Sequence, residues 1–297
     1  MKLRLGTVQF GMDYGIAGQK KPGLEASIAC LEYAAANGVM SFDTAEAYGD
    51  AEWIVGEFLS RGSASRENLS ISTKLLPNSL DGVPSEELEA VIALRLGESL
   101  SRLRTSYVDA YLLHSSRYAF RADILKALQS VKEKGLARKV GVSVYDPEEA
   151  FACIDSGLVD FMQAPYSIFD RRMKEAGVLD AASAAGVEFD TRSAFIQGLV
   201  TMSPSDVPPF LEEAVPILKK LDSIAHETGI SRVDLAMGYV AREDAVSALV
   251  FGVDSLGQLE EDICAFGRPL PTDVIELMNR EFSGISAEVV MPSLWKR

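Results

Sequence analysis

The sequence predicts a single-domain α/β protein, residues 1–297, folded as a (β/α)8 barrel. Eight short apolar runs, of the kind that form buried parallel strands, recur along the chain and alternate with longer segments that carry apolar residues at helical spacing. Most intervals between strand starts hold one strand, one helix and two short loops, and no interdomain linker interrupts them. A chain of 297 residues is long enough for one closed barrel of this type.

The strands are expected where short apolar runs begin. In order they start at Leu3 (LRLGTV), Met40 (MSFDTA), Leu69 (LSISTKL), Tyr107 (YVDAYLLH), Lys139 (KVGVSV), Phe161 (FMQAPY), Val187 (VEFDTR) and Ser247 (SALVFG). The helices are expected between them, over residues 25–37, 51–60, 85–104, 121–134, 147–155, 171–185, 211–228 and 231–242.

Boundary residues support several of these helices. Gly38 and Gly135 come just after expected helix ends, where a left-handed conformation is needed. Pro147 after Asp146, and Ser85 before an apolar run, are typical of helix starts. A doubly wound open sheet is the weaker alternative, because residues 9–15, after the first strand, lack the GxGxxG spacing of a phosphate-binding turn.

Composition excludes several classes of protein. Hydrophobic residues make up 47% of the chain and charged residues 24%, which is typical of a globular protein with a large core and not of a disordered one. The net charge of −14 disfavours nucleic acid and anionic membrane surfaces as partners. Cys30, Cys153 and Cys264 are too few and too widely spaced for a disulfide framework, and with two histidines no metal site is expected. No signal peptide or membrane span is evident, so a soluble cytoplasmic protein is expected.

Ionisable residues gather where the second to fourth strands end. Asp43, Lys74 and His114 stand at these ends, and Tyr48 follows the second strand closely. Asp43 and Lys74 lie inside apolar runs, so each is expected to be buried and to require a partner of opposite charge. Because chemistry in a barrel takes place at the carboxyl ends of its strands, we expect these four residues, the tetrad, to meet there.

The tetrad suits proton transfer to a carbonyl oxygen coupled to hydride transfer. Tyrosine is a poor acid at neutral pH, with a pKa near 10, and a neighbouring lysine ammonium is expected to lower that pKa. Asp43 would hold Lys74 charged and in place, and His114 would donate to the carbonyl or orient it. No side chain can supply a hydride, so a cofactor is required.

The contexts of the tetrad, FDTAEAYG, STK and YVDAYLLH, resemble those of the aldo-keto reductase family. The likeness continues through LGESLSRLRTSYVDAYLLH and KEKGLARKVGVSV and covers about residues 6–266. It implies a barrel that binds reduced NADP or NAD without a Rossmann domain and reduces an aldehyde or ketone, a small-molecule carbonyl substrate.

The resemblance also implies where the nicotinamide end of the cofactor binds. Ser143 and Gln163 match positions that hold the carboxamide, although Val144 stands where asparagine is usual. Arg192 replaces an aromatic residue that stacks on the nicotinamide; a planar guanidinium can stack too, and its charge would disfavour the oxidised ring. A salt bridge is the alternative role for Arg192. Residues 192–199 resemble the family's pyrophosphate-binding loop, which assigns Ser193, Phe195, Gln197 and Gly198 to the cofactor site. Thr7 and Gln9 are also assigned to this site.

The segment that aligns with the adenosine-binding part of the family departs most from the family pattern. Gly252 and Gln258 stand where cations are common, which weakens the usual presumption of NADPH and leaves the coenzyme preference open. Glu261 and Asp262 keep the expected adenine contacts, with the start of a solvated helix as the alternative.

Aromatic residues near the expected barrel mouth are candidates for a substrate wall, and packing is the alternative for each. They are Phe10, Tyr14, Tyr118 and Tyr145, with Trp53 nearby. The chain lacks an N-terminal hairpin to plug the barrel bottom and a long C-terminal substrate loop, which suggests a compact pocket open to polar, sugar-related substrates. The sequence does not indicate an oligomeric state.

Two other functions remain open at this stage. One is a non-catalytic protein that senses a nicotinamide nucleotide and regulates a partner protein. The intact tetrad disfavours this function, because a sensor does not need catalytic residues. The other is a lyase in which Lys74 forms a Schiff base with a carbonyl substrate. Asp43 is expected to keep Lys74 protonated, which disfavours this function because a protonated amine cannot attack a carbonyl carbon.

Overall fold

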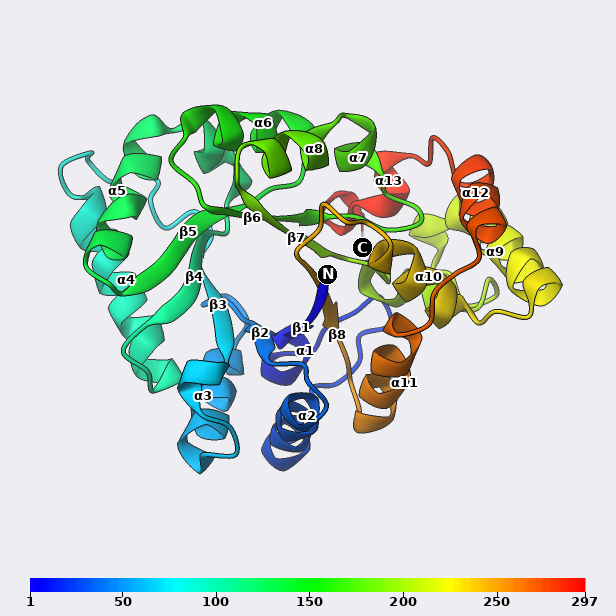
Figure 1. The fold of residues 1–297 in the computed structure, drawn as a ribbon, viewed down its shortest axis with the longest axis horizontal. Helices are drawn as coiled ribbons and strands as arrows, with labels where there is room; N and C mark the ends of the chain where they lie inside the picture. Colours follow the sequence, from blue (N-terminus) through cyan, green and yellow to red (C-terminus); the bar gives the residue numbers. More distant parts are fainter. Residues whose placement is uncertain (297) are drawn as a thin grey trace.

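The computed structural model describes residues 1–296 and has a closed barrel of eight parallel strands at its centre. Neighbouring strands follow chain order from β1 to β8, and β8 pairs with β1 to close the barrel (Figure 1). The barrel prediction is therefore confirmed and the open sheet is wrong. The strands are β1 Lys2–Gly6, β2 Ser41–Asp43, β3 Ser70–Leu75, β4 Val108–Leu113, β5 Ala137–Ser143, β6 Phe161–Pro165, β7 Glu188–Arg192 and β8 Ala248–Gly252.

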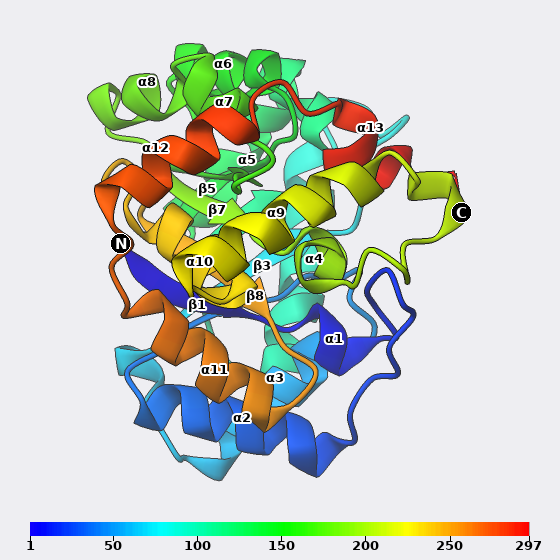
Figure 2. The ribbon, with the colours of Figure 1, turned by 90° about the vertical axis from the view of Figure 1, so that its right-hand side faces the viewer.

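Helices surround the barrel, as the alternating sequence pattern predicts (Figure 1). They are α1 Val8–Gly11, α2 Leu24–Ala36, α3 Ala51–Arg61, α4 Leu88–Leu103, α5 Ala122–Glu133, α6 Pro147–Ser156, α7 Arg172–Glu175, α8 Val178–Ala184, α9 Ala214–Thr228, α10 Arg232–Ala241, α11 Leu256–Phe266, α12 Thr272–Glu281 and α13 Ala287–Val290. In the side view, β1 runs from the N-terminus toward α1, and α13, late in the chain, lies on the same side as α1 (Figure 2). The C-terminal segment is therefore near the carboxyl ends of the strands, where chemistry is expected.

Local sequence signals explain most helix boundaries. Asp146 forms a capping box with Glu149 at the start of α6, so the predicted helix start there is confirmed. Gly38 and Gly135 adopt φ values of 84° and 72° after their helices, as predicted. Ser85 does not start a helix; its hydroxyl binds the carboxylate of Asp123, and α4 begins three residues later.

Two other expectations, one about a helix and one about a strand, are corrected. The helix expected over 171–185 is two helices, α7 and α8, because Gly177 between them has φ of 78° and ends the first. The first strand was expected to include Val8, but it ends at Gly6, and Val8 opens the short helix α1.

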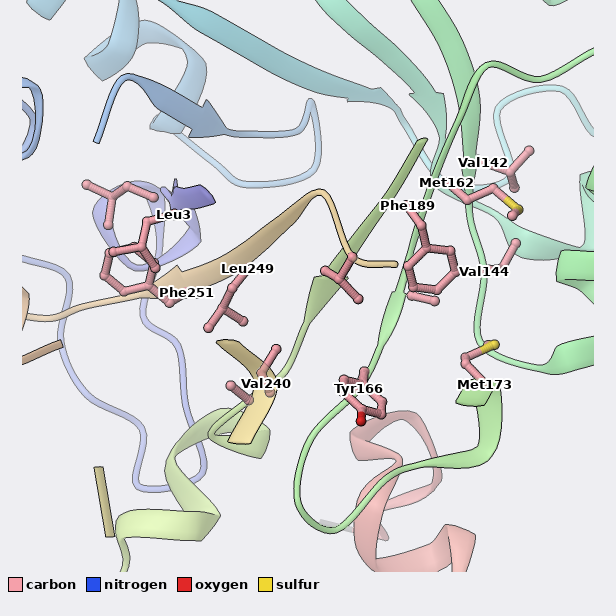
Figure 3. Close-up of a cluster of buried hydrophobic side chains, with 14 of the residues drawn as sticks. Leu3, Val142, Val144, Met162, Tyr166, Met173, Phe189, Val240, Leu249 and Phe251 are labelled. Carbon is pink, nitrogen blue, oxygen red and sulfur yellow. The ribbon is translucent and has the colours of Figure 1, made fainter. Parts of the chain in front are cut away.

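The main core lies between the strands and the helices. Leu249 and Phe251 of β8 and Phe189 of β7 are buried there, and Figure 3 shows them with Val240 of α10 and Met173 of α7. The buried side chains of Leu3, Val142, Val144, Met162 and Tyr166 complete the labelled part of this cluster. The layer fixes each strand against its helix and so holds the strand ends in place.

The inside of the barrel is partly polar. Ala110, Leu112 and Phe161 form a small apolar cluster, separate from the main core. Gly141 permits close packing beside it, since a Cβ there would lie 1.7 Å from the carbonyl oxygen of Phe161. Arg4 and Asp190, both buried, form an ion pair that also belongs to this interior.

Candidate active site

Asp43 and Lys74 form a buried ion pair at the carboxyl ends of β2 and β3. Lys74 Nζ lies 2.6 Å from Asp43 Oδ2, and the two residues are 0% and 3% exposed. Lys74 Nζ also donates to the carbonyl oxygen of Thr44 at 3.1 Å. The pair predicted from the two apolar runs is present.

The second oxygen of Asp43 is held from two other positions. Asp43 Oδ1 accepts hydrogen bonds from Ser72 Oγ and from Gln163 Nε2, both at 2.9 Å. Burial raises the pKa of Asp43, but the Lys74 ammonium and the hydrogen bonds from Lys74 and Gln163 outweigh it and lower this pKa below its usual value. Asp43 is therefore an ionised carboxylate at neutral pH, and it anchors Lys74.

Tyr48 lies directly against this pair. Its hydroxyl oxygen is 3.5 Å from Lys74 Nζ, and its ring stands edge-on to His114 with the ring centroids 5.6 Å apart. The structure thus brings the four members of the tetrad together, as the strand-end argument predicts.

The proton affinity of Tyr48 differs from the expectation. Burial raises the pKa of Tyr48 well above its ordinary value, the Asp43 carboxylate raises it further, and only Arg192 opposes them noticeably. The expected net lowering of the Tyr48 pKa is therefore wrong, and burial is the largest cause of the difference. Tyr48 consequently keeps its proton at neutral pH, as an acid must before it donates.

His114 is neutral in this site. Burial and the nearby charges of Lys74 and Arg192 lower the pKa of His114 to about 3. Its Nδ1 atom is buried and has no hydrogen-bond partner within residues 1–296. A neutral imidazole offers one N–H donor and one acceptor, which suits the orientation of a carbonyl group.

Buried polar atoms without partners mark where a nicotinamide carboxamide would fit. Among the described residues, Gln163 Oε1 and Gln9 Oε1 accept no hydrogen bond although both are buried. Ser143 is 1% exposed and is the register partner of Gln163, so its hydroxyl belongs to the same layer. Buried polar atoms normally find partners, so these atoms fit an amide ligand.

Gly252 makes room for Gln9. A Cβ at Gly252 would lie 2.3 Å from Gln9 Oε1, so the side chain of Gln9 occupies the space that any larger residue would need. Thr7, nearby in the chain, is fully buried and donates from its hydroxyl to the carbonyl oxygen of Asp43 at 3.0 Å. Thr7 therefore supports the tetrad through the backbone.

Arg192 ends β7 beside the tetrad. Its guanidinium lies 4.3 Å from the ring centroid of Tyr145 and donates to the carbonyl oxygen of Val144 at 3.3 Å and to Ser193 Oγ at 3.3 Å. Within residues 1–296 no carboxylate is close enough to form an ion pair with it, so the salt-bridge alternative is not supported. Arg192 is thus a planar cation at the mouth of the barrel.

The loop after β7 has an unusual backbone. Ser193, Ile196 and Gln197 have φ values of 66°, 49° and 55°, in the left-handed region that non-glycine residues seldom adopt, and Gly198 follows with 94°. Gln197 Nε2 donates to the hydroxyl of Tyr14 at 3.2 Å, which joins this loop to the segment between α1 and α2. Phe195 packs partly buried against the core. The strain concentrates in the segment that resembles a pyrophosphate-binding loop.

The segment expected to bind adenosine carries no cation. Residues 253–266 contain neither lysine nor arginine. Gln258 Oε1 accepts a hydrogen bond from the backbone N–H of Asp254 at 2.7 Å. Glu261 is exposed, whereas Asp262 is buried at 6% exposure, and burial raises the pKa of Asp262 to about 8. Glu261 is thus the more accessible of the two expected adenine contacts.

The expected substrate residues separate into two groups. Tyr14 and Tyr145 lie within electrostatic reach of Tyr48, at the mouth. Phe10 is fully buried in the core, and Tyr118 is buried with its hydroxyl bonded to Asp81 at 2.8 Å, so both serve packing and are not wall residues. Trp53 is 41% exposed.

Three interior residues were missed by the sequence analysis: Ser72, which holds Asp43, and the ion pair of Arg4 with Asp190. Charged residues inside apolar strands are the signal that revealed Asp43 and Lys74, and LRLGTV and VEFDTR carry the same signal.

The fold and the site together define a barrel-type oxidoreductase that uses NADP(H) or NAD(H) for carbonyl reduction. The sequence profile of the Aldo/keto reductase family matches residues 2–280, so the chain belongs to that family.

Individual relatives agree with this assignment. The uncharacterized oxidoreductase YqkF of Bacillus subtilis is 25% identical over 283 residues, covering 89% of this chain and 90% of YqkF. The L-glyceraldehyde 3-phosphate reductase of Escherichia coli K12 is 27% identical over 273 residues, covering 82% of this chain and 79% of that enzyme. An aldo-keto reductase from Bacillus halodurans, solved in its holo form, shares the fold with a TM-score of 0.77 at 20% identity over 99% of this chain and 95% of its own.

In the described part of the chain, no helix has the length and apolar character needed to cross a membrane.

Proposed function

We propose that the protein reduces an aldehyde or ketone to an alcohol, with Tyr48 as the proton donor. The observation that carries the proposal is the contact of Tyr48 with the buried Asp43–Lys74 pair, beside a neutral His114. When bound, the reduced nicotinamide supplies the hydride. Gln163, Ser143 and Gln9 would hold its carboxamide end.

The residues have distinct parts in the reaction. His114 orients the carbonyl oxygen toward the Tyr48 hydroxyl, which donates its proton to that oxygen as negative charge develops there. Lys74 stabilises the phenolate left on Tyr48, and Asp43 keeps the ammonium in position. Tyr48 then regains a proton from solvent, so the net reaction adds one hydride and one proton to the carbonyl.

We further propose that the substrate is small and polar, of the sugar-related type, and that discrimination between the two coenzymes is weak. Tyr14, Tyr145 and Arg192 give the mouth hydrogen-bonding groups, and a relative is a reductase of L-glyceraldehyde 3-phosphate. Residues 253–266 offer no cation to a 2′-phosphate, which supports NADH as a usable donor.

The substitution Tyr48→Phe tests the assignment of the acid. Because it deletes the proton donor alone, kcat should fall by about 10²–10⁴-fold while the Kd for NADH stays within about twofold. Tyr111→Phe is the matched control, since the Tyr111 hydroxyl is buried, has no partner in the described structure and is absent from the site. Carbonyl reduction by Tyr48→Phe at the wild-type rate would reject the assignment.

A Schiff-base lyase is the competing function. Lys74 Nζ is already bonded to Asp43 and Thr44, which leaves its lone pair protonated and unavailable for attack. Borohydride trapping of a carbonyl compound on Lys74 would support the lyase instead.

A further inference from the structure

A second buried ion pair lies inside the barrel, outside the tetrad. Arg4 of β1 places its Nε atom 2.7 Å from Oδ2 of Asp190 on β7, and the two residues are 5% and 0% exposed. Arg4 also lies over the ring of Phe161, a member of the small apolar cluster that is separate from the main core.

The guanidinium of Arg4 lies across the middle of the barrel. Besides Asp190 on β7, it donates to Ser70 Oγ on β3 at 3.3 Å, and it lies 5.8 Å from the ring centroid of Phe161 on β6. These strands approach from different sides of the closed barrel, in which β1 pairs only with β2 and β8. A group that reaches all of them must lie near the barrel axis.

Asp43 occupies the adjoining layer on the same axis. Its carboxylate accepts from Lys74 and Ser72 on β3 and from Gln163 on β6, again from strands on different sides. Asp43 is the register partner of Gly6, two residues beyond Arg4 on β1 and therefore on the same inward face. Gln163, which holds Asp43, is in turn the register partner of Asp190. The Arg4–Asp190 pair thus lies in the layer of the barrel interior directly next to the Asp43–Lys74 pair.

We propose that Arg4 and Asp190 are positioning residues for the reduction proposed above: their ion pair balances the charge under the Asp43–Lys74 pair and so keeps that pair ionised and in place against Tyr48. The inference rests on the proposed function of the tetrad.

The electrostatics of the interior agree with this role. Arg4 contributes, after burial and Lys74, to the balance that sets the pKa of Asp43, and it acts to lower the pKa of both Asp43 and Lys74. Burial chiefly raises the pKa of Asp190 to about 6, with smaller upward effects of Glu188 and Asp43 against the lowering effect of Arg4. Each pair therefore responds to the charge of the other.

The charged groups around Asp190 are few and can be named. Arg4 faces it from β1 and Asp43 from β2, while Glu188 on its own strand pairs with Lys139 of β5 at the barrel end. Asp190 Oδ1 is buried and has no hydrogen-bond partner within residues 1–296. A merely structural plug would be better served by apolar side chains, because a buried ion pair seldom stabilises more than they do.

The test compares Asp190→Asn with the double variant Arg4→Met/Asp190→Asn. The single variant leaves Arg4 uncompensated beneath the tetrad, and the double variant restores neutrality. We expect kcat to fall by about tenfold or more in the single variant, with the Kd for NADH within about twofold, and to recover in the double variant. Lys132→Gln breaks a partly buried ion pair with Asp160, outside the barrel interior, and is the control that should leave kcat unchanged.

A readout without turnover comes from the two histidines of the chain. His114 lies in the tetrad, whereas His226 lies on the distant helix α9 and reports non-specific effects. In ¹H–¹³C NMR spectra, the chemical shift of the His114 ring Cε1–H group should change with an inflection near pH 6, which reports the titration of Asp190. This inflection should be absent from the spectra of Asp190→Asn. The pH dependence of the His226 signal should be the same in both proteins.

The outcomes separate the inference from the function on which it rests. If the wild-type protein reduces no carbonyl but His114 responds as described, the coupling of the two pairs holds and the proposed function fails. If Asp190→Asn lowers only the melting temperature, with kcat and the His114 signal unchanged, the positioning role is overturned. Persistence of the kcat loss in the double variant would overturn it as well.

Discussion

The substitution Asp43→Asn provides the sharpest physical test of the site. Asparagine has nearly the volume of aspartate, so the change removes the negative charge without opening a cavity. Lys74, 0% exposed, then loses its 2.6 Å contact with a carboxylate and becomes an uncompensated buried charge. Breaking such a pair from one side costs about 3–5 kcal/mol. We expect a loss of this size in the free energy of unfolding at pH 6.

The same variant should show a characteristic pH dependence. Burial already lowers the pKa of Lys74, and removal of Asp43 takes away the main opposing effect, so the pKa falls further in the folded variant. Between that lowered pKa and the ordinary value of about 10.4, the unfolded chain binds more protons than the folded one, and stability rises with pH by up to about 1.4 kcal/mol per unit. The deficit relative to wild type should therefore shrink as pH increases toward 10.

Urea unfolding of both proteins between pH 6 and pH 9.5 measures this difference. Ser72→Ala is the matched control, because it removes one hydrogen bond to the same carboxylate without removing a charge, and it should cost about 1.5–3 kcal/mol at every pH. A loss below about 1 kcal/mol for Asp43→Asn, constant with pH, would refute the description of Asp43 and Lys74 as a buried ionised pair.

Three further predictions concern the cofactor end of the barrel. Gly252→Ala would place a Cβ 2.3 Å from Gln9 Oε1 and displace that flexible side chain, so fluorescence titration should show about tenfold weaker NADH binding with little change in melting temperature; unchanged affinity would remove Gln9 from the site. Arg192→Tyr removes a cation that disfavours the oxidised ring, so NAD⁺ should gain affinity relative to NADH, and an unchanged ratio would exclude this role. Burial raises the pKa of Asp262 to about 8, so its ionised form opposes folding increasingly from about pH 4 upward; Asp262→Asn should be more stable than wild type at pH 8 by about 1 kcal/mol or more and should lose this advantage near pH 4, and equal thermal midpoints at both pH values would contradict the reasoning.

The fold and the tetrad could be predicted because both depend on local pattern. Eight apolar runs alternating with amphipathic segments specify strands and helices directly, and parallel strands that close into a barrel necessarily bring their carboxyl ends together. Asp43, Lys74 and His114 could therefore be predicted to lie close together, although 71 positions separate the first residue from the last. Charges inside apolar runs carried this inference, since burial requires that they be paired.

Features that depend on distances across the barrel could not be predicted. LRLGTV and VEFDTR each contain a buried charge, but only closure of the barrel shows that Arg4 reaches Asp190, 186 positions away. The upward shift of the Tyr48 pKa has the same origin, because it depends on the depth of burial of Tyr48 and on the nearby Asp43 carboxylate. The break between α7 and α8 was only weakly indicated by the sequence, because a glycine within an apolar helical pattern is often tolerated. The positive φ of Gly177, which ends α7, became evident only in the structure.

Binding of a reduced nicotinamide nucleotide tests the central claim most directly, because it requires no knowledge of the carbonyl substrate. Titration of the purified protein with NADH and with NADPH, followed by fluorescence, should show saturable binding. The Kd values for the two nucleotides should be similar, because residues 253–266 offer no cation to the 2′-phosphate of NADPH. Saturable binding that weakens in Gly252→Ala is the predicted result. Absence of binding by both nucleotides at millimolar concentration would contradict the assignment of this barrel as an NAD(P)H-dependent carbonyl reductase.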